Sequence, residues 1–208
     1  MNTAQPPERT SERLIAFLDA AIAISMTLLI LPLMESVSEA VTDERTVVQY
    51  VRDHSWQLVA FALSFVIIAM FWRLHHGILH ADTPAGRRRT NLQLAWLFTI
   101  TVMPVVTALT GGLDTDREVV ASYIGTLTVS AWLLFTIAVV ERRTRTAAGL
   151  PVAASIAAMP LSLALLFTLA LLLGLLVPSY LWLFVMALVT PLRTLLLRAG
   201  VVGRENAP

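Results

Sequence analysis

An acidic side chain, Asp19, lies inside the first apolar stretch of this sequence. Residues 13–33 read Arg-Leu-Ile-Ala-Phe-Leu-Asp-Ala-Ala-Ile-Ala-Ile-Ser-Met-Thr-Leu-Leu-Ile-Leu-Pro-Leu, and a helix of about twenty such residues crosses a bilayer. Ionisable groups at membrane depth are costly, so Asp19 is a candidate functional residue that needs a partner on another helix. The alternative is that Asp19 lies at the membrane interface and is hydrated there.

The same stretch carries an aliphatic stripe. A helix turns by about 100° per residue, so Ile24, Leu28 and Leu31, spaced i, i+4 and i+7, share one side. Asp19 projects about 140° away from Ile24 by the same geometry. Such stripes are commonplace in membrane helices, where ordinary helix packing explains them.

The second apolar stretch ends in Phe-Trp-Arg-Leu-His-His-Gly-Ile-Leu-His, residues 71–80. Trp72 and Arg73 suit the membrane interface, where aromatic rings and long basic side chains settle. His76 and His80 have the i, i+4 spacing with which one helix face holds a metal ion. Two ligands do not make a site, so we predict no metal and no haem here.

Composition places the chain among membrane proteins. Apolar residues make up 57% of it and charged residues only 14%, and the formal net charge is +1, so there is no basic surface for nucleic acid. The sequence has no cysteine, which excludes disulfides and thiolate sites. No nucleophile elbow, phosphate loop or zinc-protease motif occurs. We therefore predict neither an enzyme nor a cofactor.

Hydropathy predicts an all-α membrane protein with six transmembrane helices. The apolar stretches are residues 13–33, 55–80, 91–111, 119–140, 152–176 and 179–197, each long enough to span when tilt is allowed. Residues 13–198 would form the membrane domain, after a disordered arm at 1–12 and before a tail at 199–208. The first stretch is too long for a cleaved signal peptide and contains an acid, so we predict that it is retained.

Loop charges predict the orientation. Arginines gather in residues 81–90 and 141–149, whereas acids dominate residues 35–54 and 112–118. Positive loops stay on the cytoplasmic side. The arginine-rich loops and both termini are therefore predicted to be cytoplasmic.

A family resemblance rests on the first stretch. Arg13-x-x-x-Phe17-Leu18-Asp19, followed by Ala-Ile and Thr-Leu-Leu-x-Leu, resembles the first-helix signature of the transmembrane protein 175 family. Its members are endosomal and lysosomal potassium channels in animals, with shorter bacterial relatives. The family pattern is Arg-x-x-x-Phe-Ser-Asp, so Leu18 replaces a serine, and we expect Leu18→Ser to be tolerated.

The resemblance implies a network between the ends of the first two helices. In it, a tryptophan and a histidine of the second helix pack and hydrogen-bond against the first-helix motif. An indole or imidazole donor would satisfy the Asp19 carboxylate. The residues concerned are Arg13, Phe17, Asp19, Thr27, Trp72, His75 and His76.

The resemblance also implies a function and an assembly. A single six-helix repeat implies a homotetramer in the plasma membrane of a bacterium, with four first helices around a pore. Ile24, Leu28 and Leu31 would form a hydrophobic constriction, which gates by dewetting. The channel would favour potassium modestly, because the sequence has no Thr-Val-Gly-Tyr-Gly filter. Two other classes stay open: a proton-coupled secondary transporter that uses Asp19, and a non-conducting membrane scaffold.

Overall fold

The protein is all-helical with six candidate membrane spans, as the sequence predicts. The computed structural model describes residues 7–83, 86–153 and 155–201, and within them no strand occurs. The helices are α1 Pro7–Leu28, α2 Leu31–Thr42, α3 Val47–Asp53, α4 Ser55–Ile78, α5 Arg87–Gly112, α6 Arg117–Ala147, α7 Ala158–Leu176, the 3₁₀ helix η1 Tyr180–Leu188, and α8 Val189–Arg198. The pair α1–α2 forms one span and the pair η1–α8 another, beside α4, α5, α6 and α7.

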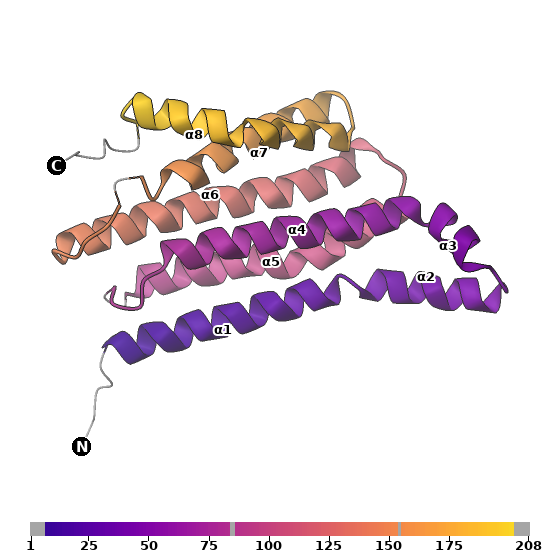
Figure 1. Ribbon diagram of the computed structural model, residues 1–208, viewed down its shortest axis with the longest axis horizontal. Coiled ribbons are helices and arrows are strands. Elements are labelled where there is room, and N and C mark those ends of the chain that lie inside the picture. Colours follow the sequence, from indigo (N-terminus) through magenta and orange to yellow (C-terminus); the bar gives the residue numbers. More distant parts are fainter. Residues whose placement is uncertain (1–6, 84–85, 154, 202–208) are drawn as a thin grey trace, which may run out of the picture.

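Successive spans run in opposite directions, side by side (Figure 1). In the centre, α5 packs against α1, α4 and α6, and α6 then packs against α7. The α1–α2 span lies at one edge of the bundle and the η1–α8 span at the other. The start of α1 and the end of α8 lie at the same end of the molecule, where α4 ends and α5 begins.

Side-chain caps fix several helix starts. The Asp116 carboxylate accepts a hydrogen bond from the Val119 N–H at 2.8 Å and so begins α6. Thr46 and Gln49 form a reciprocal capping box at the start of α3. Such caps satisfy N–H groups that have no partner within the helix.

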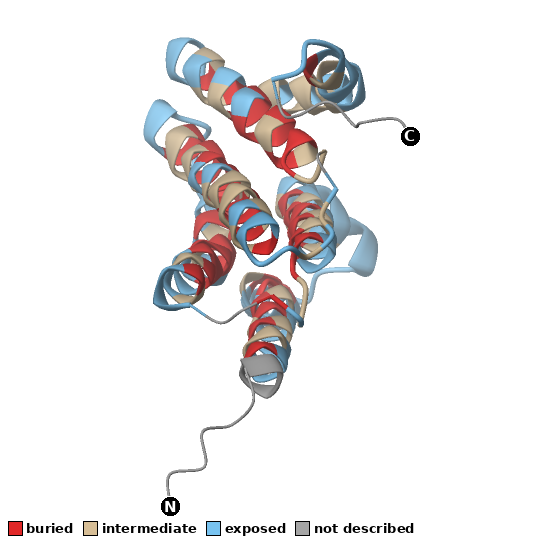
Figure 2. Cartoon of the chain, turned by 90° about the vertical axis from the view of Figure 1, so that its left-hand side faces the viewer, coloured by how far each residue is buried: buried red, intermediate tan, exposed pale blue. Residues whose placement is uncertain are grey.

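The core lies between the helices, on the faces that Figure 2 shows in red. Within a membrane the hydrophobic effect does not drive helices together, so van der Waals contacts between small residues contribute more to helix packing. The buried alanines Ala131, Ala138 and Ala164 belong to α6 and α7, which pack against each other. A Cβ added to Gly174 of α7 would come within 3.0 Å of Val120 Cγ1, so this contact favours glycine.

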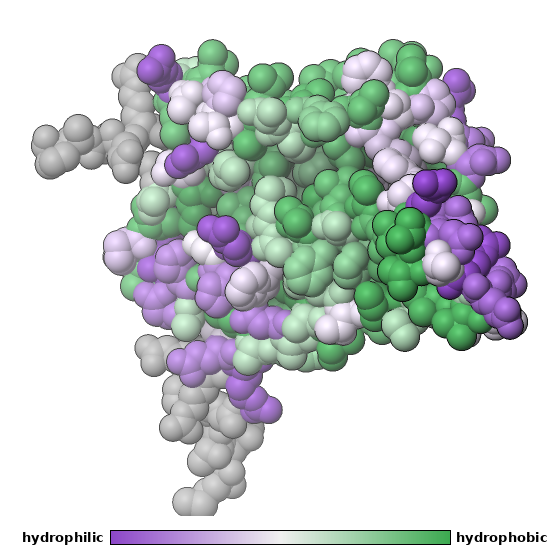
Figure 3. Space-filling view, turned by 45° about the vertical axis from the view of Figure 1, so that its right-hand side comes forward, coloured by the Kyte–Doolittle hydropathy of each residue, from purple (hydrophilic) through white to green (hydrophobic). Residues whose placement is uncertain are grey.

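The outer surface suits a bilayer. Apolar side chains cover the middle of the face in Figure 3, and hydrophilic ones gather toward its two ends. Exposed apolar residues occur on every span, among them Ile24, Val66, Phe98 and Phe184. The spans therefore expose apolar side chains to their surroundings, as contact with lipid requires.

The first span is broken where the sequence predicts a continuous helix. The α1 helix ends at Leu28, and α2 begins at Leu31 with Pro32 in its first turn. Proline has no N–H, so the bond back to the Leu28 carbonyl cannot form. The predicted stripe of Ile24, Leu28 and Leu31 therefore runs across a break between two helices.

Several predicted boundaries also need correction. The α1 helix begins at Pro7, so part of the arm predicted to be disordered is helical, while residues 1–6 lie outside the described residues. The third and fourth spans extend beyond their apolar stretches, to Arg87 and to Ala147. Polar residues in those turns bind other elements, and hydropathy alone does not register such contacts.

Candidate functional site

Asp19 meets two aromatic side chains of α4. The Trp72 Nε1–H donates to Asp19 Oδ1 at 2.9 Å, and His76 Nδ1 lies 3.6 Å from Asp19 Oδ2. Trp72 and His76 are one turn apart on α4, so they share a face, and their ring centroids are 5.8 Å apart. The Asp19 side chain is 33% exposed. The three residues join the first span to the second.

A groove opens beside this contact. It has a volume of about 340 Å³ and is lined by Asp19 and His76, by Glu12 near the start of α1, and by apolar side chains of both spans. Its polar lining consists of two carboxylates and one imidazole. The site therefore combines a helix-to-helix contact with an opening that carries two acids.

His75 and His76 point in different directions. The His75 side chain is buried and stacks on Trp96 of α5, with ring centroids 4.0 Å apart and planes 12° apart. Consecutive helical residues diverge by about 100°, so only one of the two can face α1. The structure brings His76 to Asp19 and places His75 in the core.

Not every residue of the expected network meets Asp19. The Thr27 hydroxyl donates to the Ile24 carbonyl at 2.7 Å, and it lies eight residues, about 12 Å, further along the helix. The structure therefore does not bring Thr27 to the Asp19 contact. Phe17 is 55% exposed and Arg13 is also exposed, both on α1 before Asp19.

Leu18 is a core residue. Its side chain is 0% exposed and belongs to the main apolar cluster together with Ile22 and Phe71. A serine here would leave a cavity and bury a hydroxyl, both of which destabilise a helix bundle. The expectation that Leu18→Ser is tolerated is therefore revised.

The aliphatic stripe lies on the opposite side of the first span. Ile24 is 60% exposed, Leu28 41% and Leu31 53%, whereas Ile22 is 1% exposed and Leu29 1%. The first span thus packs one face against the bundle and leaves the other apolar face uncovered. Leu31 keeps an outward position although it follows the helix break.

His80 does not share a helix face with His76. It lies beyond the end of α4, and its Nδ1 is 2.9 Å from the Ile78 carbonyl oxygen. The i, i+4 geometry considered for a metal ion is therefore lost. Among the described residues there is no group of three or more histidine, cysteine or acidic side chains placed to hold a metal ion.

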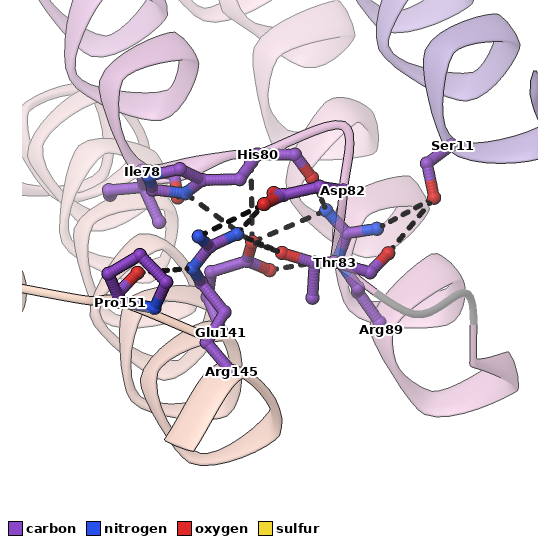
Figure 4. Close-up of polar contacts among 9 residues, drawn as sticks. All are labelled: Ser11, Ile78, His80, Asp82, Thr83, Arg89, Glu141, Arg145 and Pro151. Atoms are coloured by element: carbon purple, nitrogen blue, oxygen red, sulfur yellow. Dashed lines mark hydrogen bonds and ion pairs between the residues drawn. The ribbon is translucent and has the colours of Figure 1, made fainter. Parts of the chain in front are cut away.

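A buried ionic cluster lies at the end of the molecule where α1 begins (Figure 4). The sequence does not predict this cluster. Glu141 of α6 is 0% exposed, and its Oε2 accepts a hydrogen bond from Arg89 Nε at 2.8 Å. The Thr83 hydroxyl and the His80 N–H donate to its Oε1, at 2.5 and 3.3 Å. A buried carboxylate needs such compensation, because burial of an unpaired charge is very costly.

The cluster extends to Arg145 and to α1. Arg145 is 3% exposed, binds the Asp82 carboxylate through both terminal nitrogens, and donates from Nε to the Pro151 carbonyl at 3.0 Å. The hydrogen bond from Arg145 lowers the pKa of Asp82. Ser11 of α1 accepts a hydrogen bond from Arg89 at 3.3 Å and donates to the Thr83 carbonyl at 3.2 Å. The cluster therefore joins α1, α5 and α6 to the α4–α5 loop and to the segment that follows α6.

Glu141 is a second acid that packs among the helices, and hydropathy does not predict it. Arg89 and Arg145 lie in the arginine-rich segments that predict the orientation, and Glu141 lies just beyond the predicted end of the fourth stretch. The one available signal was a single glutamate directly before the basic run at 142–145. Its partner Arg89 is 52 residues away, so the pairing appears only once α5 and α6 are packed together.

A match to a known family covers the first two spans and part of the third. Residues 13–104 match the model of a family described as the endosomal/lysosomal potassium channel TMEM175. No curated protein and no solved structure matches the chain. The matched range runs from α1 into α5, so it contains the Asp19 contact with Trp72 and His76 and the whole aliphatic stripe.

Proposed function

Because residues 13–104 of this chain match the family model of the potassium channel TMEM175, we propose that the protein is a cation channel that favours potassium and conducts passively. The family match carries this proposal, since the family is one of potassium channels and the matched range contains nearly the whole first span. Many membrane proteins share helix count and hydropathy, which alone do not favour a channel.

The proposed assembly is a homotetramer with the first span around the central axis. This span lies at the edge of the bundle and contacts α4 and α5 on one side only. Its other side carries the exposed Ile24, Leu28 and Leu31. Four copies arranged around an axis would bury these side chains against one another and leave the ionic cluster within each subunit.

Ile24, Leu28 and Leu31 form the proposed constriction. Along a helix, Ile24 and Leu28 are about 6 Å apart in height, so they would make successive apolar collars. A narrow apolar collar excludes water and passes ions only when it widens. Selectivity then depends on the width of the collar and on the ion's hydration.

The contact between Asp19, Trp72 and His76 holds the pore span in the proposed channel. It fixes the first span to α4 on the side away from Ile24, and so sets the angle at which the stripe faces the axis.

The proposed location is the plasma membrane of a bacterium, with both termini and the arginine-rich ends on the cytoplasmic side. Arg89 and Arg145 are compensated by buried or neighbouring acids. Arg87, Arg88 and Arg143 are exposed at the same end, and these are the charges that resist translocation.

Ion flux from liposomes tests the function. Liposomes that contain the purified protein should release potassium down its gradient, sodium more slowly, and chloride at the rate of protein-free liposomes. A proton-coupled transporter would instead move a substrate together with protons and saturate. A scaffold would show no flux of any ion, and that result would remove the proposal.

A further inference from the structure

A groove that is apolar at one end and basic at the other lies on the other side of the molecule from the first span. It has a volume of about 600 Å³ and is formed by α6, the start of α7 and Val201, which follows α8. Its apolar lining includes Phe135, Val139 and Leu161, and its polar lining consists of Arg142, Arg143 and Thr146.

The lining changes from apolar to basic along one side of α6. Phe135, Val139, Arg142 and Thr146 are three or four residues apart, which keeps them on a common face, and Arg143 lines the same groove beside Arg142. Phe135 and Arg143 are about 12 Å apart along the helix axis. An amphiphile with a hydrocarbon chain and a charged head, aligned with α6, meets matching chemistry at both ends.

The positive charge at the basic end of the groove favours the binding of an anion. Ala157 is the N-cap residue of α7 and lines the groove, so the positive end of that helix adjoins the two arginines. The lining contains no carboxylate among the described residues.

We propose that this groove binds an anionic phospholipid of the surrounding bilayer. The phosphate lies between Arg142 and Arg143, and an acyl chain follows Val139 and Phe135 with Leu161 opposite. Basic pockets between membrane helices, at the headgroup level, are suited to such lipids. A free phosphate ion would leave the apolar lining uncovered. The proposal does not depend on ion conduction, since it needs only a bilayer around α6 and α7.

Lipid binding to the purified protein in detergent tests the proposal. Native mass spectrometry would compare phosphatidylglycerol with phosphatidylcholine of the same acyl chains, and the intact protein should prefer phosphatidylglycerol. The double variant Arg142→Gln/Arg143→Gln should lose about tenfold or more of that preference, from the attraction typical of two arginines at a membrane surface. The matched control Arg87→Gln/Arg88→Gln removes two exposed charges at the same end and should keep it.

Two further measurements separate a lipid site from an ion site. Val139→Trp fills the apolar part of the groove while both arginines stay, so it should also weaken phosphatidylglycerol binding. Inorganic phosphate should not displace the lipid. The proposal would be overturned if the Arg142→Gln/Arg143→Gln and Arg87→Gln/Arg88→Gln proteins lost the preference for phosphatidylglycerol equally. Displacement of the lipid by inorganic phosphate, or normal phosphatidylglycerol binding by a folded Val139→Trp protein, would also overturn it.

Discussion

Asp19 and Glu141 are both acids that bind residues of other helices, and they differ in burial. Asp19 keeps 33% of its side chain exposed and accepts a hydrogen bond from one indole. Glu141 is fully buried and is compensated by a guanidinium, a hydroxyl and a backbone N–H. The first arrangement leaves the carboxylate access to water if the contact opens, whereas the second fixes α5 to α6 because separation would leave a buried charge unpaired.

A double-mutant cycle tests the contact between Asp19 and Trp72. Asp19→Ala and Trp72→Phe should each lower the thermal stability of the detergent-purified protein, because each leaves its partner without a hydrogen bond. The combined variant should lose less than the sum, by roughly 1 kcal/mol. Additive losses would show that the two side chains do not stabilise each other.

A second residue-scale prediction compares a buried ion pair with an exposed one. Arg89–Glu141 and Arg45–Asp53 have similar N–O distances, 2.8 and 2.7 Å, but only the first is buried. Glu141→Ala should cost about 3–5 kcal/mol of unfolding free energy, and Asp53→Ala about 0–1 kcal/mol. Chemical denaturation in detergent measures both. Similar losses would mean that Glu141 is hydrated and not part of a buried cluster.

At the scale of elements, the sequence predicts the six spans and the two faces of the first one, because apolar length and helical spacing are local properties. It does not predict the break after Leu28, since proline occurs both inside and at the ends of membrane helices. It also leaves His75 and His76 as alternatives, which only the packing of α4 against both α1 and α5 resolves. The Glu141 cluster depends on residues far apart in the chain.

The two faces of α1 should respond differently to one kind of substitution. Leu18→Ser removes a fully buried side chain and should lower the free energy of unfolding by about 2–4 kcal/mol, although it restores the family pattern. Phe17→Ser alters an exposed neighbour and should change stability much less. Thermal unfolding and the yield of folded protein measure the difference. If the Leu18→Ser protein were as stable as the unmodified protein, Leu18 would not belong to the face of α1 that packs in the core.

For the molecule as a whole, the alternating spans place chain segments at two opposite ends, and labelling can assign each end to a side of the membrane. The chain has no cysteine, so single cysteines give clean signals. Arg88 and Val48 are both exposed and belong to opposite ends of the bundle (Figure 1). A membrane-impermeant maleimide should label Val48→Cys on intact cells and Arg88→Cys only after lysis. The reverse pattern would invert the proposed orientation.

In the proposed channel, conduction depends on which face of the first span surrounds the axis. Asparagine has as many side-chain heavy atoms as isoleucine, is smaller in volume and adds hydrogen-bonding groups, so the proposed collar of four should wet more easily. Ile24→Asn should therefore raise cation flux from liposomes and reduce the preference for potassium over sodium. The matched variant Ile22→Asn changes a residue that is 1% exposed and points about 160° away on the helix, so it should lower the yield of folded protein and leave selectivity unchanged. A proton-coupled transporter carrying the Ile24→Asn change would instead show a slower, saturable flux. If Ile24→Asn and Leu28→Asn proteins both conduct potassium as the unmodified protein does, then this face does not line the pore, and another helix has to be sought around the axis.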